Sequence, residues 1–232
     1  MKSPKADKST WFGARIYQGL SELVKDLFYR WVRNTSRTLV VVVFGFRTMG
    51  RQYLPSDGNA IFLSTHQSML DPVLVGLVFN GKLNYIARKS LFHQPLFAFL
   101  IRLLDAIEID RERGGLAGLR EMMKRLHDGK MVLIFPEGTR TADGEIGELK
   151  LGFLPIARKT KAALVPMAIA GAIDVLPRKS KFPQRYPIAI VVGKPISYNQ
   201  LNSIDDNALM VRLKHQLDQC KSEADFLTSS NG

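Results

Sequence analysis

Short apolar runs alternate with segments of helical periodicity along most of the chain. Apolar runs of about four to eight residues between turn-forming residues predict buried strands. We expect strands at 39–50, 60–63, 83–87, 106–109, 132–134, 163–170 and 188–192. Apolar steps of three and four residues, or apolar runs opened by a proline, predict helices at 72–79, 91–104, 116–126, 149–161 and 205–227. This alternation predicts an α/β fold: a central mixed sheet, parallel in its middle, with helices on both faces.

An N-terminal amphipathic helical segment precedes the predicted sheet. Residues 1–9 form a polar, lysine-rich tail, and residues 11–32 repeat apolar positions at helical spacing, which predicts one wide apolar face. Basic residues lie off that face, and a tryptophan stands near each end. This composition is typical of a helix in a membrane interface, with Trp11, Phe12 and Trp31 as its interfacial residues. The alternative is that the same face docks on the protein's own core.

Length and charge divide the chain into two parts. Its 232 residues, 46% of them hydrophobic, suit one domain with an appendage. We place the tail and interfacial segment at 1–38 and the α/β domain at 39–232. The net charge of +12 calls for an anionic partner: nucleic acid, a membrane surface or phosphorylated substrates. Residues 1–53 hold ten Lys and Arg against three acidic residues, so much of that charge lies near the N-terminus.

Several classes of site are disfavoured by composition. Cys220 is the only cysteine, which excludes a disulfide framework and a thiolate metal site and fits a reducing compartment. The four histidines show no metal-ligand spacing, so we expect no metal. We also expect no signal peptide and no transmembrane helix. The longest candidate span, residues 39–46, is far shorter than the roughly 18 residues that a span requires.

The segment 64–72, Ser-Thr-His-Gln-Ser-Met-Leu-Asp-Pro, joins a predicted strand to a predicted helix. His66 and Asp71 would not share a face of a regular helix, but a bend between them lets the two side chains meet. Asp71 would then hold one imidazole nitrogen, and the other nitrogen could take a proton from a hydroxyl. The alternative is that Asp71 only caps the helix that starts at Pro72, with His66 a polar loop residue.

Basic residues follow several of the predicted strands. Arg88, Arg111 and Arg140 each come at or just after a strand end, as His66 does. Because the carboxyl ends of parallel strands meet at one edge of a sheet, we expect these residues to cluster there. Arg140 ends the segment 135–140, Phe-Pro-Glu-Gly-Thr-Arg, whose guanidinium, hydroxyl and glycine suit a phosphate group. For Arg140 alone the alternative is a solvated surface charge.

His-X4-Asp followed by Phe-Pro-Glu-Gly-Thr-Arg resembles the glycerolipid acyltransferase family, particularly the 1-acylglycerol-3-phosphate acyltransferases. Two weaker segments, 107–111 and 164–169, fit the same pattern in the same order, and the resemblance covers residues 47 to 196. One segment departs from it. Where many members read Lys-x-Glu-Leu, this chain reads Arg88-Lys89-Ser90-Leu91, which leaves open whether Arg88 or Lys89 faces a substrate.

The resemblance implies transfer of a fatty acyl group from a thioester to the 2-hydroxyl of 1-acylglycerol 3-phosphate. His66 would be the base and Asp71 its partner. The donor would be acyl-CoA or acyl-acyl carrier protein, with no further cofactor. The chain has no G-x-S-x-G nucleophile elbow, and Cys220 lies in a late polar helix, so we expect direct attack without an acyl-enzyme. The expected phosphate and glycerol ligands are Arg88, Lys89, Arg111, Glu137, Gly138, Thr139 and Arg140.

Other functions stay open at this point. A related enzyme could use glycerol 3-phosphate or a lyso-aminolipid as acceptor, and a non-catalytic lipid-binding protein would not need His66 for turnover. A nucleic-acid-binding module would place its basic residues in one stripe interleaved with exposed aromatics, which fits this chain poorly. We expect a peripheral or monotopic protein on the cytoplasmic face of a membrane, with anionic lipid favoured. The sequence leaves the oligomeric state open.

Overall fold

The structure is a computed structural model, and it describes residues 8–55, 58–80, 83–88, 107–109, 116–178, 180 and 182–229. Within these ranges, the side chains of residues 8–23, 25, 26, 86–88, 107–109, 116 and 117 lie outside the description. The chain divides into two compact units, Met1–Leu39 and Val40–Gly232. Each is described on its own.

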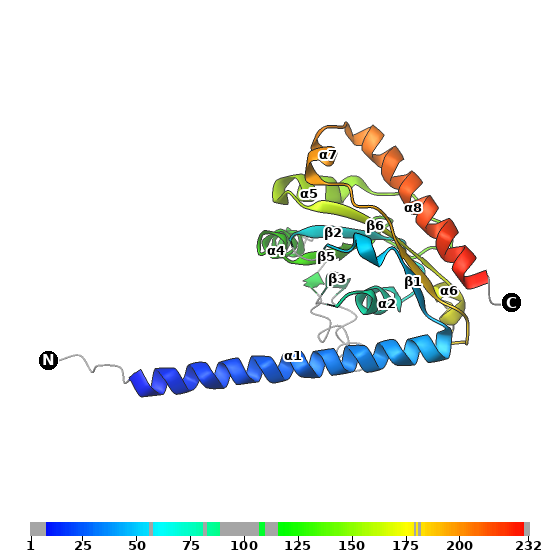
Figure 1. The fold of residues 1–232 in the computed structure, drawn as a ribbon. Helices are drawn as coiled ribbons and strands as arrows, with labels where there is room; N and C mark the ends of the chain where they lie inside the picture. Colours follow the sequence, from blue (N-terminus) through cyan, green and yellow to red (C-terminus); the bar gives the residue numbers. More distant parts are fainter. Residues whose placement is uncertain are drawn as a thin grey trace. The chain divides into compact units, whose positions relative to one another are not determined.

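The larger unit is built on a seven-stranded sheet with strand order β1-β7-β6-β2-β5-β3-β4 (Figure 1). The strands are β1 Arg47–Met49, β2 Ala60–Ser64, β3 Asn84–Arg88, β4 Ile107–Ile109, β5 Met131–Ile134, β6 Ala163–Ala170 and β7 Ala189–Val192. Apolar runs form the buried centre of this sheet. Every residue of β2 is buried, and every residue of β6 after Ala163 is buried as well.

The sheet is parallel in its middle. β6, β2, β5, β3 and β4 run parallel to one another, whereas β7 pairs antiparallel with β6 and parallel with β1. This confirms the predicted central mixed sheet. Consequently the carboxyl ends of these five parallel strands lie at one edge, and the loops that follow β2, β5 and β6 leave the sheet there.

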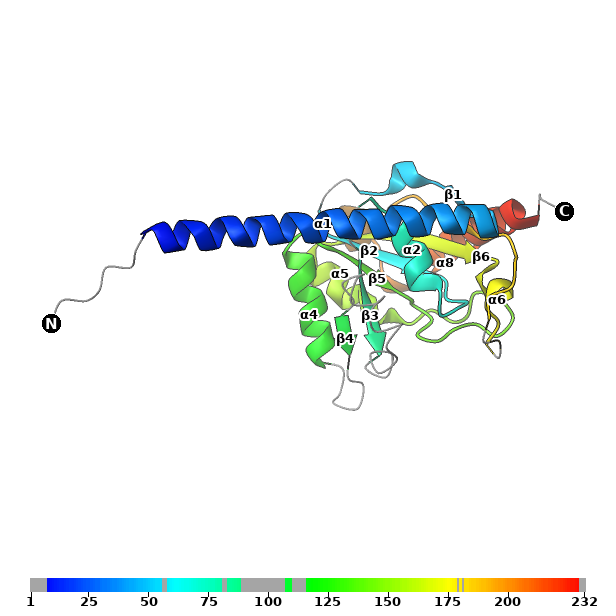
Figure 2. The ribbon, with the colours of Figure 1, turned by 90° about the horizontal axis from the view of Figure 1, so that it is seen from below.

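Helices cover both faces, as predicted. One face packs Ile61, Leu63 and Leu164 against the apolar sides of four helices, which are α4 Leu116–His127, α5 Leu154–Thr160, α7 Tyr198–Asn202 and α8 Asp206–Ser229. Figure 1 shows α8 lying along β6 and β7, and Figure 2 shows α4 beside β4 and β5. On the other face, Phe62 meets Phe79 edge-on at 4.6 Å, directly after α2 Asp71–Val78.

Two predicted elements differ from the structure. The strand expected at 39–50 is wrong, because α1 runs from Lys8 to Phe44 and only Arg47–Met49 forms a strand. The helix expected at 149–161 is shorter: a 3₁₀ turn, η3 Leu151–Phe153, precedes α5, which starts where Pro155 can occupy its first turn. A further 3₁₀ turn, η1, covers Arg51–Tyr53, and the short helix α6 covers Ala172–Val175. The helix expected at 91–104 lies outside the described residues.

The smaller unit contains most of α1, which confirms the N-terminal helix and extends it beyond residues 11–32. The side chains of Trp11 and Phe12 lie outside the description. Trp31 is 64% exposed, and its ring stacks with that of Phe28 at 6.3 Å. Among the described helices, none combines the length and the apolar character that crossing a membrane requires.

Candidate active site

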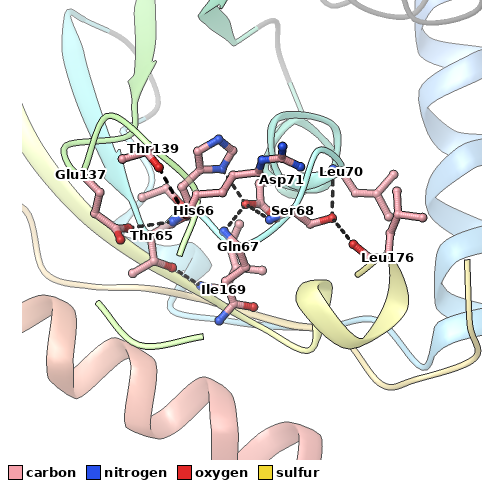
Figure 3. Close-up of polar contacts among 12 residues, drawn as sticks. Thr65, His66, Gln67, Ser68, Leu70, Asp71, Glu137, Thr139, Ile169 and Leu176 are labelled. Atoms are coloured by element: carbon pink, nitrogen blue, oxygen red, sulfur yellow. Dashed lines mark hydrogen bonds and ion pairs between the residues drawn. The ribbon is translucent and has the colours of Figure 1, made fainter. Parts of the chain in front are cut away.

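His66 and Asp71 meet in the bend between β2 and α2. The Nδ1 atom of His66 lies 2.8 Å from Oδ2 of Asp71 (Figure 3). The Asp71 side chain is fully buried, and the His66 side chain is 19% exposed. The imidazole of His66 is therefore accessible to solvent, while the carboxylate that holds it is buried inside the protein.

Asp71 also holds the backbone of the bend. Its Oδ2 atom accepts hydrogen bonds from the backbone N–H groups of Gln67 at 2.6 Å and Ser68 at 2.8 Å. The N-cap of α2 is Leu70, and Asp71 is the first helical residue, so the interpretation of Asp71 as only a cap is wrong. Burial raises the pKa of the Asp71 carboxyl, and the hydrogen bonds from His66, Ser68 and Gln67 act against that rise.

The other side of the imidazole has no polar partner among the residues that the structure describes. The His66 ring stacks on Phe135 with 4.0 Å between centroids and 20° between planes. Stacking and the Asp71 bond fix the ring, while Nε2 forms no hydrogen bond within the described part of the chain. A histidine held in this way can take a proton from a hydroxyl placed against Nε2.

Glu137 connects the His66 loop to the loop after β5. Its Oε1 accepts from the backbone N–H of His66 at 2.9 Å (Figure 3). Its Oε2 accepts from the backbone N–H of Gly147 at 3.0 Å. The N–H of Thr141 donates in return to the carbonyl oxygen of His66 at 2.8 Å. Burial raises the pKa of Glu137, and the bonds from Gly147 and His66 lower it. Both carboxylate oxygens of Glu137, which is among the phosphate and glycerol ligands expected from the sequence, thus hold backbone N–H groups.

The turn at 138–140 follows directly. Gly138 has a φ of 70°, a left-handed conformation that favours glycine, and its N–H donates to the carbonyl oxygen of Phe135 at 3.0 Å. Thr139 is exposed, and its hydroxyl donates to the carbonyl oxygen of Arg140. The half-buried Arg140 guanidinium forms no ion pair or hydrogen bond among the described residues. It is a cation available for an anionic ligand.

Sequence reasoning missed Lys150. A Cβ atom at Gly138 would lie 3.0 Å from the Lys150 Nζ atom, so this side chain passes over the turn. The loop is tied in place because the N–H of Lys150 donates to the carbonyl oxygen of Pro136 at 2.9 Å. The only sequence signal was a lysine in a polar loop after Arg140, which nothing separates from a surface lysine.

The structure brings together His66, Asp71 and the 137–140 turn at the edge where β2 and β5 end. Arg88 is the last residue of β3 and so belongs to the same edge, but its side chain lies outside the description. Lys89 and Arg111 lie outside the described residues. Within the described ranges, no group of three His, Cys, Asp or Glu side chains could hold a metal ion.

Comparison with known proteins identifies relatives of this chain. The chain is 26% identical over 192 residues to a 1-acyl-sn-glycerol-3-phosphate acyltransferase of Bacillus subtilis, covering 82% of this chain and 94% of that one. It is 30% identical over 151 residues to a chloroplastic enzyme of the same name from Arabidopsis thaliana, covering 63% of this chain but only 42% of the plant protein.

The fold has a solved counterpart. The crystal structure of the 1-acyl-sn-glycerophosphate acyltransferase PlsC from Thermotoga maritima matches with a TM-score of 0.74 at 21% identity, covering 92% of this chain and 88% of that one. At this identity the match shows a shared fold. The family model described as acyltransferase matches residues 45–170, which include His66, Asp71 and the whole 135–140 segment. Since that match spans more than half of the sequence, the chain belongs to the acyltransferase family.

Proposed function

We propose that this protein transfers a fatty acyl group from a thioester to the 2-hydroxyl of 1-acylglycerol 3-phosphate, giving phosphatidate. The observation that carries the proposal is the His66–Asp71 contact of 2.8 Å at the sheet edge, with Nε2 unengaged among the described residues and the unpaired Arg140 in the neighbouring loop. The names of the Bacillus and Arabidopsis relatives support the same acceptor.

His66 acts as the general base. Its Nε2 takes the proton from the acceptor hydroxyl as the hydroxyl oxygen attacks the thioester carbon. Asp71 holds the tautomer that carries a proton on Nδ1, and its carboxylate stabilises the imidazolium. The tetrahedral intermediate then breaks its C–S bond, and the imidazolium returns the proton to the thiolate. We assign no role to a protein nucleophile; the only cysteine, Cys220, is buried, and burial raises the pKa of its thiol to about 12.

The tetrahedral oxyanion needs hydrogen-bond donors close to the base. The N–H of Gly138 is engaged with Phe135, so it does not serve. The backbone N–H groups of Thr139 and Arg140 have no partner among the described residues, and they follow Gly138 in the same turn. We assign the oxyanion to these two donors.

Arg140 anchors the phosphate of the acceptor. Its planar guanidinium can bind two phosphate oxygens at once, and Lys150 adds a second cation over Gly138. The hydroxyl of Thr139 is exposed beside them. Arg88, Lys89 and Arg111 stay predicted members of this anchor. Arg88 ends β3, Lys89 follows it in the sequence, Arg111 comes after β4, and the carboxyl ends of both strands lie at the same edge.

Membrane contact through α1 completes the proposal. Val24, Leu27, Phe28 and Trp31 lie on the predicted apolar face, and all four are exposed. An exposed apolar face with basic flanks suits the interface of an anionic membrane, where the acceptor lipid resides. We therefore place the protein at the cytoplasmic face of a membrane, bound peripherally or monotopically.

The test is acyl transfer by the purified protein in detergent, with acyl-CoA and acyl-acyl carrier protein as donors. The acceptors are lysophosphatidate, glycerol 3-phosphate and a lyso-aminolipid, and His66→Ala is the control for host enzymes. We expect turnover with lysophosphatidate that His66→Ala abolishes. Turnover confined to either of the other acceptors would overturn the proposed substrate, and equal product from His66→Ala would overturn the proposed base.

A further inference from the structure

A basic loop connects α6 to β7 and leaves the sheet at the same edge as the active site. This basic loop, residues 176–187, carries four Lys and Arg residues, and no acidic residue occurs anywhere from 175 to 204. Two aromatic side chains in it are exposed: Phe182 at 78% and Tyr186 at 42%. A bulky apolar ring with most of its surface in water is not accounted for by packing within the described structure.

The start of the basic loop is fixed to the active site. The hydroxyl of Ser68, in the bend that holds His66, donates to the carbonyl oxygen of Leu176 at 3.3 Å, and Figure 3 shows these two residues beside each other. Two residues further on, the guanidinium of Arg178 donates to the carbonyl oxygen of Arg140. The bend of His66 and the turn of Arg140 therefore both contact the first residues of the basic loop.

Two further hydrogen bonds hold described residues of the loop. The hydroxyl of Ser180 donates to the carbonyl oxygen of Phe182 at 2.7 Å. The N–H of Gln184 donates to the carbonyl oxygen of Val175, also at 2.7 Å. At the return to β7, any Cβ atom on Gly171 would collide with the Pro187 carbonyl oxygen, so the chain passes directly over this glycine. The exposed Phe182 thus lies in a turn that hydrogen bonds hold in place.

We propose that the basic loop is a second membrane contact, in which Phe182 enters the lipid interface and the described basic residues of the loop, Arg178 and Arg185, bind anionic headgroups. Exposed aromatic rings among basic residues are suited to the region between headgroups and acyl chains. Because the loop is braced against the bend of His66 and the turn of Arg140, its insertion would bring the active-site edge to the lipid surface. This inference rests on the proposed function only in assuming that a lipid surface is the substrate's location.

A lipid surface fits the loop better than an acidic protein or a nucleic acid. Either of those could match the charge, but neither explains why a phenylalanine at the loop tip stays 78% exposed, with Pro183 directly after it. An apolar ring gains most where water is excluded over its whole surface, as in the outer hydrocarbon layer. The acidic-protein alternative is kept as an outcome of the test.

Insertion can be read directly with a fluorescent label. The sole native cysteine, Cys220, is buried, so an environment-sensitive maleimide dye will react selectively with Phe182→Cys in the full chain. The matched control is Phe226→Cys on α8, which replaces a phenylalanine that is 70% exposed. On addition of vesicles containing an anionic phospholipid, we expect a blue shift at position 182 and none at position 226.

Binding itself is measured by co-sedimentation with the same vesicles. Phe182→Ala should lower the partition coefficient about tenfold, the scale of removing one buried aromatic side chain, whereas Phe226→Ala should leave it unchanged. Arg185→Glu should lower binding to anionic vesicles at least about fivefold and change binding to neutral vesicles little. Its matched control is Lys130→Glu, an exposed position just before β5, at the opposite end of that strand.

Each outcome decides the inference. If the dye at position 182 shows no blue shift while the protein sediments with vesicles, the inference is wrong. It is also wrong if an acidic carrier protein produces the blue shift and vesicles do not. Turnover of a short-chain soluble acceptor is measured in parallel, and Phe182→Cys should retain it. If the wild-type protein binds vesicles through Phe182 but acylates no acceptor, the proposed function fails and the membrane contact stands.

Discussion

The backbone N–H of His66 donates a hydrogen bond of 2.9 Å to Oε1 of Glu137. The two residues follow neighbouring parallel strands, β2 and β5, and belong to the two motifs that carry the family resemblance. Glu137 is only 5% exposed, and its second oxygen holds Gly147. A buried carboxylate that holds backbone on both sides fixes the position of the imidazole, so we regard Glu137 as a positioning residue.

The raised pKa of Glu137 predicts a pH-dependent effect of Glu137→Gln on stability. A carboxyl whose pKa is raised by folding contributes stability that is full below its ordinary value of 4.5 and is lost as the pH rises through the raised pKa. The glutamine variant lacks this titration. Relative to wild type, its free energy of unfolding should therefore increase from about pH 4 to about pH 7.

Urea unfolding at several pH values measures that difference, with Glu145→Gln in the exposed part of the loop as control. A difference between wild type and Glu137→Gln that is the same at every pH would contradict the prediction.

His66→Ala should lower turnover by about 10²–10⁴, the usual contribution of a general base. The side chain makes its polar contact only with Asp71 among the described residues, so the fold should survive. Steady-state acyl transfer from a sample free of host acyltransferase measures the loss, and His127→Ala, at an exposed position on α4, is the matched control. Near-normal turnover would exclude His66 as the base.

Asp71→Ala should cost stability as well as activity, unlike His66→Ala. Its Oδ2 atom accepts from two backbone N–H groups besides His66, and all three donors would be left in a buried site. We expect a loss of about 1–3 kcal/mol, the penalty of a buried unsatisfied donor. Asp71→Asn keeps one oxygen acceptor, so it should lose less stability while still losing most activity. Equal thermal stability of Asp71→Ala and wild type would show that the bend does not depend on this carboxylate.

Strand positions were predictable where burial alone decides the conformation. Residues 163–170 were predicted as a strand and form β6 with the same bounds, because an apolar run in the middle of a sheet is buried on both faces. The run Leu39–Val43 was wrongly predicted as a strand from its β-branched residues. It continues α1, since helix propagation from the preceding turns outweighs a weak local preference for strand.

The sequence allowed us to predict which residues form the site, but not most of the contacts that these residues make. The meeting of His66 with Asp71 follows from the spacing, the bend and the strand-to-helix junction. The bonds from Glu137 to the backbone of His66 and Gly147 did not follow, because a carboxylate beside an arginine gives no sign that it will hold main chain instead. Lys150 depends on the path of a loop of ten residues, which no local pattern fixes.

Arg140→Ala should weaken the use of lysophosphatidate by about 1.5–3 kcal/mol, the scale of a hydrogen bond to a charged group. The guanidinium has no partner among the described residues, so its loss should leave the fold intact. The measurement is kcat/KM for lysophosphatidate and for a phosphate-free analogue, with Arg120→Ala at an exposed site on α4 as control. Similar losses for both acceptors would contradict phosphate anchoring, whereas a loss confined to the phosphorylated acceptor supports it.

Deleting residues 1–34 should separate membrane binding from catalysis. The deletion removes the exposed Val24, Leu27, Phe28 and Trp31, while the larger unit begins only at Val40 and keeps the bond from the Ile188 N–H to the Phe44 carbonyl oxygen. Binding to anionic vesicles should therefore fall more than turnover of a short-chain soluble acceptor. High salt should weaken binding of the full chain only in part, because charge attraction is screened and apolar burial is not.

Co-sedimentation with neutral and anionic vesicles measures binding, and thermal unfolding checks that the truncated chain is folded. The substitution Trp31→Ala offers a milder change, since it removes one exposed ring and leaves α1 in place. It should reduce binding to both kinds of vesicle, because it removes apolar area and no charge. Unchanged vesicle binding after truncation would exclude α1 as a membrane contact, and a truncated chain that fails to fold would mean that the apolar face of α1 belongs to the protein's own core.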